Sequence, residues 1–212
     1  MGHTPHRARA KHQTTHPVHV TLRASLRSFR SQQVARTILG ALRDSRRETF
    51  RIAHYSIQDN HLHLIVEAEN KTALSSGVRG LTIRIAKRLN QLLFRRGAVW
   101  ADRWHGHALK TPREVRNALI YVLQNRRKHA HVSAHAQSHG ASCRRARAAQ
   151  PMRTHSRALD PLSSAAWFSG FATALTANFR SIGPPAIANP QTWLLQVGWQ
   201  RHGLIQLWES PR

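Results

Sequence analysis

An α+β fold is predicted for this 212-residue chain by two kinds of apolar pattern and by the order in which they occur. Segments in which apolar and polar residues alternate are typical of half-buried strands, and apolar residues at every third or fourth position are typical of amphipathic helices. These segments follow one another as strand, helix, strand, strand, helix, strand and a last helix. That order predicts a ferredoxin-like split β-α-β sheet with helices on one face, the other face remaining open, and a C-terminal extension.

The first four elements are a strand, a helix and a hairpin. Residues 16–23 alternate in the manner of a strand, and residues 31–44 carry apolar residues at helical spacing behind Ser31, which can cap the helix. Residues 49–57 and 61–68 are rich in strand-forming residues and flank a short polar linker that suits a turn. These segments predict three strands of the sheet and its first covering helix.

A long amphipathic helix is predicted over residues 72–94, where apolar residues step by threes and fours. Arg84, Arg88 and Arg95 form a basic row away from that apolar stripe. Such a row fits either a solvated face or a face that contacts phosphates, and the sequence leaves both interpretations open.

The last strand and the last helix follow. Residues 99–110 predict a strand. Thr111 can cap the next helix, Pro112 suits its first position and Glu114 completes a capping box. We expect this helix to run to about Lys128.

The composition divides the chain into four parts. Residues 1–15 predict a disordered basic arm, and residues 131–160 predict a basic linker rich in His, Arg and Ala. Between them, residues 16–130 hold all the predicted strands and long helices. Residues 161–212 regain tryptophan and phenylalanine, so we expect this extension to cover hydrophobic surface on its own domain or on a partner.

The charge of the chain points to a polyanionic partner. Lys and Arg number 33 against 9 Asp and Glu, which gives a formal net charge of +24. Phosphate backbones fit such an excess best, although arginine richness can also reflect genome composition. With so few carboxylates, a two-metal nuclease site made only of acidic residues is hard to assemble.

Cysteine content and hydropathy argue against other classes. The single cysteine, Cys143, can form neither an internal disulfide nor a multi-thiolate zinc site, so we expect an intracellular protein. No apolar run approaches the roughly 20 residues that span a bilayer. We therefore expect a cytoplasmic, nucleoid-associated protein without a membrane partner.

Two histidines stand on one face of a predicted strand. His61 and His63 alternate with apolar residues, so their imidazoles are expected about 7 Å apart on the same side. That spacing lets two imidazoles share a divalent cation when a third ligand approaches. His105 and His107 have the same spacing, and structural roles can also explain such a pair.

The two tyrosines of the chain are candidate nucleophiles. Tyr121 stands beside the apolar stripe of the last helix, and Asn125 follows it four residues later, about 40° round the helix axis. Phenol and amide therefore project from one side of the helix. Tyr55 is a rival on the strand ahead of the histidines, and Tyr121 can also be an ordinary boundary aromatic.

Together these motifs resemble single-tyrosine HUH transposases of the insertion-sequence type. The resemblance rests on NHLHLIV at residues 60–66 and on YVLQN at residues 121–125, and it covers roughly residues 16–129. Three further features resemble the branch associated with repetitive extragenic palindromes, namely Trp100, ALIY at 118–121 and NRR at 125–127.

The resemblance implies a role for each candidate residue. His61 and His63 would hold a divalent metal, Mg²⁺ or Mn²⁺, and Tyr121 would be the nucleophile. Asn125 is implied as the third ligand, with Gln124 as its local rival. Such a metal polarises phosphoryl oxygens, and tyrosine attack gives a 5′-phosphotyrosine and a free 3′-OH that can later rejoin strands without ATP.

The implied activity is that of a metal-dependent single-stranded DNA endonuclease and strand transferase that cuts at hairpin-flanking sites, as a monomer or a homodimer. Single-stranded or hairpin DNA is the expected partner. The residues expected to contact DNA are Arg84, Arg88, Arg95, Arg126, Arg127, Trp100 and Trp104. The alternatives are a domesticated nucleic-acid-binding protein that keeps the fold but no longer cuts, and a structural RNA-binding protein.

Overall fold

The structure of the chain is a computed structural model that describes residues 12–26, 28–136, 159–173 and 182–209. Within the last long helix, side chains are described only as far as Asn125. Most of the expected arm and linker, and the side chains of Arg126 and Arg127, lie outside the described residues. No helix in the described part of the chain is long and apolar enough to cross a membrane.

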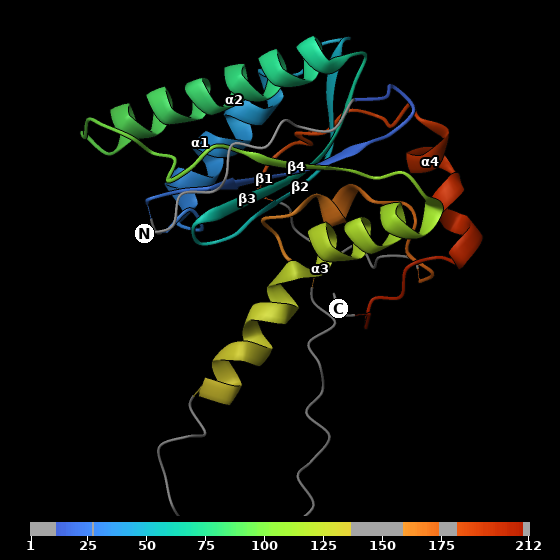
Figure 1. Cartoon of the computed structure of the whole chain (residues 1–212). Coiled ribbons are helices and arrows are strands. Elements are labelled where there is room, and N and C mark those ends of the chain that lie inside the picture. Colours follow the sequence, from blue (N-terminus) through green and yellow to red (C-terminus); the bar gives the residue numbers. More distant parts are fainter. Residues whose placement is uncertain (1–11, 27, 137–158, 174–181, 210–212) are drawn as a thin grey trace, which may run out of the picture.

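Four antiparallel strands form one sheet in the order β2-β3-β1-β4. The strands are β1 (Val18–Arg23), β2 (Phe50–Ile57), β3 (His61–Ala68) and β4 (His105–Ala108), and the first two helices are α1 (Gln32–Arg43) and α2 (Lys71–Leu92). The order of elements along the chain and of strands across the sheet is that of a ferredoxin-like split arrangement. The predicted α+β fold is confirmed (Figure 1).

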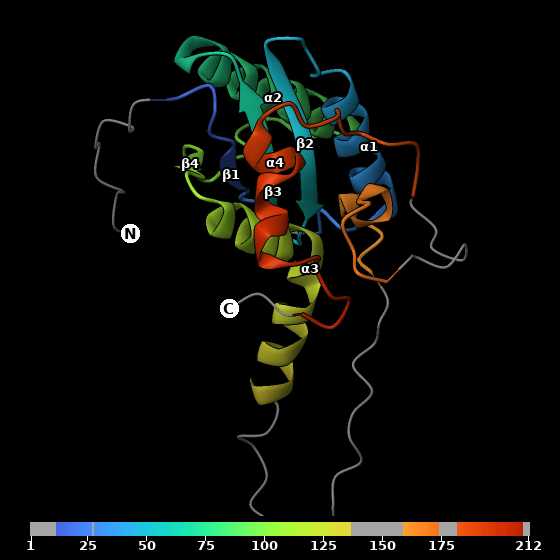
Figure 2. The ribbon, with the colours of Figure 1, turned by 90° about the vertical axis from the view of Figure 1, so that its right-hand side faces the viewer.

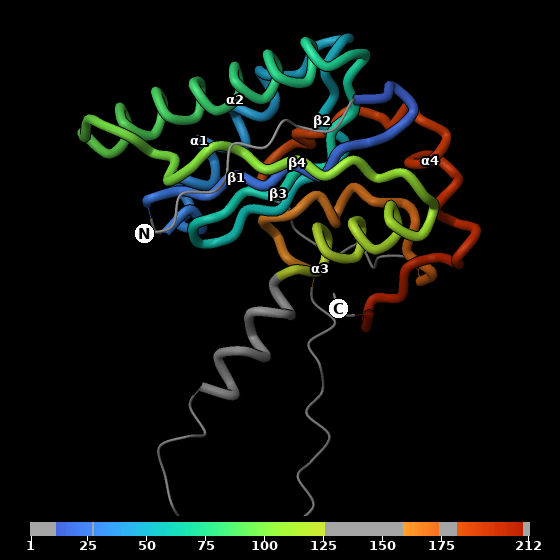
Figure 3. The backbone as a smooth tube through the Cα atoms, in the orientation of Figure 1, coloured from blue at the N-terminus to red at the C-terminus, as the bar shows by residue number. Residues whose placement is uncertain are grey.

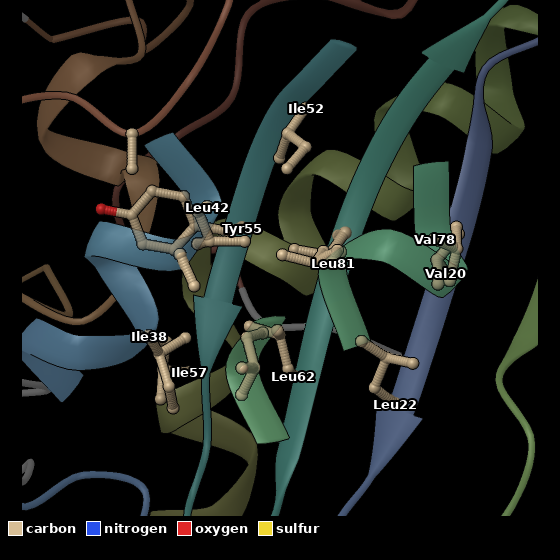
Figure 4. Close-up of a cluster of buried hydrophobic side chains, with 14 of the residues drawn as sticks. Val20, Leu22, Ile38, Leu42, Ile52, Tyr55, Ile57, Leu62, Val78 and Leu81 are labelled. Atoms are coloured by element: carbon tan, nitrogen blue, oxygen red, sulfur yellow. The ribbon is translucent and has the colours of Figure 1, made fainter. Parts of the chain in front are cut away.

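One face of the sheet, called here the apolar face, carries the hydrophobic residues of the alternating pattern. On the two central strands these are Val18, Val20, Leu22, Leu62, Leu64 and Val66. Helices α1 and α2 pack on this face, and Figure 4 shows Ile38 and Leu81 among the strand residues. Tyr55 of β2 belongs to the same cluster and is only 1% exposed. The helices and the strands therefore share one hydrophobic core.

The last strand is shorter than the segment 99–110 that predicted it. β4 keeps only His105–Ala108, and an isolated bridge joins Trp100 to the residue after β1. Between them, the carboxylate of Asp102 accepts the N–H of Arg103 at 2.7 Å. A side chain that takes up a backbone donor in this way competes with the strand ladder, which explains the interruption.

The last long helix, α3 (Pro112–Ala136), begins as predicted and ends later than predicted. Thr111 Oγ1 accepts the N–H of Glu114 at 3.2 Å, and the Glu114 carboxylate accepts the N–H groups of Lys110 and Thr111 at 2.6 and 3.1 Å. This reciprocal pattern is the predicted capping box. At Gln124 the backbone leaves helical geometry, with φ −123° and ψ 15°, so α3 is kinked there (Figure 1).

The second face of the sheet, called here the histidine face, is covered, which corrects the expectation that it stays open. Its residues on the central strands are His19, Thr21, Arg23, His61, His63, Ile65 and Glu67. Helix α3 packs on this face, where Val115, Leu119 and Ile65 share one hydrophobic cluster (Figure 2). The reason is that α3 must bury its own apolar stripe, while α1 and α2 already occupy the opposite face.

The C-terminal extension completes the covering of the histidine face (Figure 3). Its short helices are η1 (Ser164–Trp167), α4 (Trp193–Gln196) and η2 (Gly198–His202). Phe168, Leu195 and Trp199 are buried in the same hydrophobic cluster as α3. Within residues 159–173 and 182–209, this confirms the expectation that the extension covers hydrophobic surface on its own domain.

Three carboxylates tie the extension to the rest of the domain. Asp160 accepts two hydrogen bonds from Arg30, at 2.6 and 2.8 Å, and Glu209 accepts two from Arg116, both at 2.8 Å. Glu67 of β3 is 1% exposed and accepts two backbone N–H groups at the start of α4, each at 2.8 Å. Paired carboxylate and guanidinium groups of this kind are strong and directional, so they fix where the extension docks.

Candidate functional site

A polar cluster lies on the histidine face where β1, β3 and α3 meet. His63 on β3 stands opposite Thr21 on β1, and the ring of Tyr121 reaches His63 from α3. Strand alternation turns His61 and His63 to the same side, and the packing of the apolar stripe of α3 brings Tyr121 over them. Three elements that are far apart in the sequence thus contribute to one site.

The two histidines of β3 are held as a parallel pair. The ring centroids of His61 and His63 are 6.0 Å apart with only 6° between the ring planes. Nδ1 of His61 is 2.6 Å from Asn60 Oδ1, and Nδ1 of His63 is 3.2 Å from Thr21 Oγ1. A histidine that donates its Nδ1–H to an oxygen keeps its lone pair on Nε2, the arrangement found in metal-ligating histidines.

Tyr121 makes edge-to-face ring contacts with His63 and His19. Its ring centroid is 5.1 Å from that of His63 at an interplanar angle of 87°, and 5.6 Å from that of His19 at 61°. The side chain is partly buried. Edge-to-face contacts on two sides fix the direction in which the phenol points. The structure therefore brings together His61, His63 and Tyr121, as the sequence motifs predicted.

Asn125 follows one helical turn after Tyr121 and has a buried side chain that lacks partners. The residue is 1% exposed, and neither its Oδ1 nor its Nδ2 has a hydrogen-bond partner within the described part of the chain. Burying an unsatisfied amide costs about 1–3 kcal/mol, so such a group calls for a ligand. The rival Gln124 is engaged elsewhere, because its Nε2 donates to the Gln206 carbonyl at 3.0 Å.

The donor set fits a divalent cation if an amide completes it. Among the residues that the structure describes, no three His, Cys, Asp or Glu side chains gather into a metal-binding group. His61 and His63 offer imidazole nitrogens, and the orphaned amide of Asn125 offers a harder oxygen donor, the type that Mg²⁺ and Mn²⁺ accept. A set with so few protein ligands leaves coordination positions for oxygens of a phosphate.

His19 belongs to the cluster although the sequence motifs did not select it. Its ring lies 5.5 Å from His63 and 5.6 Å from Tyr121, and its buried Nε2 has no hydrogen-bond partner in the described residues. Burial, together with the smaller effect of nearby His107, lowers the pKa of His19 to about 4. The alternating pattern already put His19 on the polar side of its strand. The strand register that sets it beside His63 could not be predicted from that pattern.

The second histidine pair lies one strand further out on the same face. His105 and His107 of β4 stand opposite Thr21 and His19 of β1, and both imidazoles are exposed. Their Nε2 atoms lie 4.0 Å from carboxylates, that of Asp102 for His105 and that of Glu114 for His107. This pair therefore lines the surface beside the cluster rather than its centre.

The rival nucleophile Tyr55 lies on the opposite side of the sheet. Its ring is buried in the core of the apolar face, beside Leu42 (Figure 4). Burial raises the pKa of Tyr55 to about 12; Arg43 opposes this rise and Asp160 adds to it. A phenol that is enclosed by hydrocarbon and hard to ionise is unsuited to attack a phosphodiester.

The basic row comprises Arg84 and Arg88 on α2 and Arg95 just after it. α2 packs on the apolar face, across the sheet from the polar cluster. Arg84 donates to Ser45 Oγ at 2.5 Å, and Arg88 pairs with the Asp44 carboxylate at 2.5 Å. Arg95 donates to the Ala98 carbonyl at 3.2 Å. The structure thus does not bring these arginines together with the histidines.

The two candidate stacking residues pack against the core of the apolar face. Trp100 Nε1 donates to the Thr82 carbonyl at 3.0 Å, and its ring meets Phe29 edge-on at 6.0 Å. Trp104 covers Gly106 so closely that a Cβ there would lie 2.5 Å from its ring. Both indoles thus serve packing, and their contact with DNA stays a prediction.

Comparison with known proteins gives a family match. Residues 12–125, more than half of the chain, match the family model described as transposase IS200-like. No curated protein matches the chain. Among solved structures, a REP-associated tyrosine transposase bound to a REP hairpin is 20% identical, with a TM-score of 0.45 over 59% of this chain and 74% of that one. A protein from Deinococcus radiodurans R1 assigned as a transposase is 14% identical, with a TM-score of 0.36 over 67% of this chain and 100% of that one.

Proposed function

The chain belongs to the IS200-like transposase family, and from this premise we propose that it is a metal-dependent endonuclease and strand transferase of single-stranded DNA, with Tyr121 as nucleophile. The observation that carries the proposal is the contact of the Tyr121 ring with His63, whose ring lies parallel to that of His61. A phenol beside two imidazoles on a strongly basic protein suits attack on a phosphodiester.

We assign the metal to His61, His63 and Asn125. The support is the orientation of both imidazoles through their Nδ1 atoms and the buried amide of Asn125 that lacks a partner in the described residues. When bound, Mg²⁺ or Mn²⁺ polarises the phosphoryl oxygens and neutralises their charge. The protein side chains supply the fixed geometry into which the DNA phosphate must fit.

In the proposed reaction, Tyr121 forms a covalent bond to the DNA phosphate. Its phenol gives up a proton, its oxygen attacks the phosphorus, and the bond from phosphorus to the 3′ oxygen breaks. The products are a 5′-phosphotyrosine and a free 3′-OH. Attack by a 3′-OH on the phosphotyrosine reverses the step and joins strands, since the tyrosyl ester conserves the bond energy. His19 and His63 contact the Tyr121 ring and thus hold its direction through both steps.

The charge of the protein supports DNA as the partner, and hairpin-flanking sites are the proposed targets. We propose that Arg126 and Arg127, which follow Asn125 directly in the sequence, contact phosphates near the cleavage site. Arg84, Arg88 and Arg95 are retained only as contacts to DNA that passes beyond this site, because α2 packs on the apolar face. We further propose that residues 16–130 supply the catalytic side chains and residues 161–212 support them from outside.

The experiment is to incubate the protein with labelled single-stranded DNA from beside its own gene, with Mn²⁺ or with a chelator. A protein–DNA adduct that survives denaturation and forms only with the metal is the expected result. DNA binding without an adduct would instead favour the alternative, a nucleic-acid-binding protein that keeps the fold but no longer cuts.

A further inference from the structure

A pocket of about 650 Å³ opens at the other end of α3, away from Tyr121. Its walls come from the segment before β1, from β2, from the start of α3 and from the C-terminal extension, and include Thr15, Arg51, Lys110, Trp193 and Arg201. A volume of this size suits a small organic ligand. None of the residues proposed for catalysis lines it.

Trp193 gives this pocket an aromatic wall that contacts η2. The residue is 49% exposed, and η2 supports its ring through Gly198 and Arg201. A Cβ on Gly198 would lie 2.7 Å from the indole, and the Arg201 guanidinium carbon lies 4.8 Å from the ring centroid. A half-exposed indole held in place by its own segment is a ready stacking platform for a planar group.

The remaining lining is cationic and hydroxylic. Arg51, Lys110 and Arg201 are the cations, and Thr14, Thr15 and Thr192 add hydroxyl groups. Glu67 lies beneath this wall, but its carboxylate is 3.6 Å from Arg51 and already accepts three hydrogen bonds at the start of α4. Glu114 is engaged in the capping box of α3. An excess of positive charge therefore faces the pocket.

A planar stacking surface beside cations and hydroxyl groups is the chemistry that recognises a nucleotide. We propose that this pocket binds one nucleotide of the single-stranded DNA substrate, with the base stacked on Trp193 and a phosphate held by Lys110 and Arg201. This inference rests on the proposed function and adds a second DNA contact to it. The contact comes from the C-terminal extension and lies outside the polar cluster.

The pocket and the polar cluster lie on one path for the strand. Pro112 lines the pocket, and Tyr121 follows nine residues later, which is ~14 Å along the axis of α3. The exposed ring of His107 on the edge strand β4 lies between them, opposite His19. One continuous strand can therefore occupy both places, so the pocket sets which stretch of DNA reaches Tyr121.

The test measures binding of a fluorescent oligothymidylate to the full-length protein. Trp193→Ala should weaken binding about tenfold, the effect of losing one stacked base, whereas Trp193→Phe should restore most of it. Trp208→Ala is the matched control, because Trp208 is an exposed indole of the same extension, 69% exposed, that does not line the pocket. A photoreactive iodouracil oligonucleotide should crosslink within residues 191–201.

A second pair of variants removes cations from the pocket lining and leaves Trp193 itself unchanged, although Arg201 also contacts the indole. A plot of log affinity against log salt concentration has a negative slope for DNA binding. Lys110→Gln combined with Arg201→Gln should make this slope shallower by about 0.7 to 1.4. Arg79→Gln combined with Lys87→Gln removes two exposed charges of α2 and should change the slope less. This pair keeps the test decisive if Trp193→Ala does not fold.

Unchanged oligothymidylate binding by the folded Trp193 and Lys110/Arg201 variants would overturn the inference, even if the wild-type protein forms its covalent adduct. Binding that depends on Trp193 without any adduct would instead leave the pocket standing and remove the proposed function. Tighter, Trp193-dependent binding of oligouridylate would overturn the assignment to DNA.

Discussion

The two faces of the sheet are built from the same strands but hold different kinds of side chains. Leu64 on the apolar face is fully buried among hydrocarbon groups, whereas its neighbour His63 on the histidine face contacts His61, His19 and Tyr121. Strand alternation alone separates the two environments by a single residue. Both faces bury hydrophobic residues, and the histidine face also holds the polar cluster.

The faces also differ in how they are covered. α1 and α2, which are interleaved with the strands along the chain, cover most of the apolar face, and α3 covers the histidine face. The C-terminal extension packs mainly on the histidine face, but its Leu162 and Ala186 are buried in the apolar-face cluster. The second covering depends on long-range polar ties such as Arg30 to Asp160 and Arg116 to Glu209. A functional surface can thus be altered from outside without rebuilding the core beneath it.

The largest effect is expected from replacing the histidine pair. His61→Ala together with His63→Ala should reduce DNA cleavage by about a thousandfold or more, because the proposed metal loses two ligands, while folding and single-strand binding persist. Cleavage assays with Mn²⁺ and binding by fluorescence anisotropy measure the two properties.

Leu64→Ala is the matched control on the apolar face. It should cost about 2–5 kcal/mol of unfolding free energy, because a fully buried leucine leaves a cavity. His105→Ala with His107→Ala should impair cleavage less than the first pair. If that outer pair proves essential and His61 and His63 dispensable, the metal has been assigned to the wrong histidines.

A smaller effect is expected from pH on the free energy of unfolding. It arises from His54, a histidine that is buried beneath the C-terminal extension. His54 lies within 3.2 Å of Ser164 Oγ, and burial lowers its pKa from 6.5 to about 4. As pH falls from 6.5 to 4, the unfolded chain binds a proton at this imidazole and the folded chain does not, so stability falls. The loss through His54 should be about 3 kcal/mol at most.

Urea unfolding at neutral pH and near pH 4.5 measures this dependence. His54→Gln keeps a polar side chain that does not titrate, so its unfolding free energy should change less between the two conditions than that of the wild-type protein. Equal losses in both proteins would show that the acid sensitivity of the fold arises elsewhere.

The smallest effect is expected from removing charges on α2, which packs on the apolar face. Arg84→Gln with Arg88→Gln should change the affinity for single-stranded DNA by less than about threefold, since α2 lies across the sheet from Tyr121 and its ion pair with Asp44 is exposed. The same titration should show a larger loss for Lys110→Gln with Arg201→Gln. The reverse order would place the DNA on α1 and α2.

The approach of Tyr121 to the histidines was implied only by the family resemblance. Local patterns were enough to predict the sheet, the capping box of α3 and the placement of His61 and His63 on one side of their strand. Each depends on a repeat of two or of three to four residues, or on a short motif, that can be recognised within one segment. The interruption before β4 was missed because it depends on a single side-chain hydrogen bond, that of Asp102 to the N–H of Arg103.

The features that escaped prediction are those that depend on distant segments. That α3 covers the histidine face follows only once α1 and α2 occupy the other one. His19 joins the cluster through the register between β1 and β3, which alternation does not specify. Trp193 gains its place through the buried carboxylate of Glu67, more than a hundred residues earlier in the chain, and sequence patterns do not show such a tie.

The central claim is that the histidine face carries the chemistry, and the two tyrosines test it most directly because they lie on opposite faces. Tyr121→Phe and Tyr55→Phe remove the same oxygen, so their capacity to form a denaturation-resistant DNA adduct with Mn²⁺ can be compared at equal folding and DNA binding. The account predicts no adduct from Tyr121→Phe and a wild-type amount from Tyr55→Phe. An adduct formed by Tyr121→Phe would contradict it and would assign the attack on phosphorus to another group.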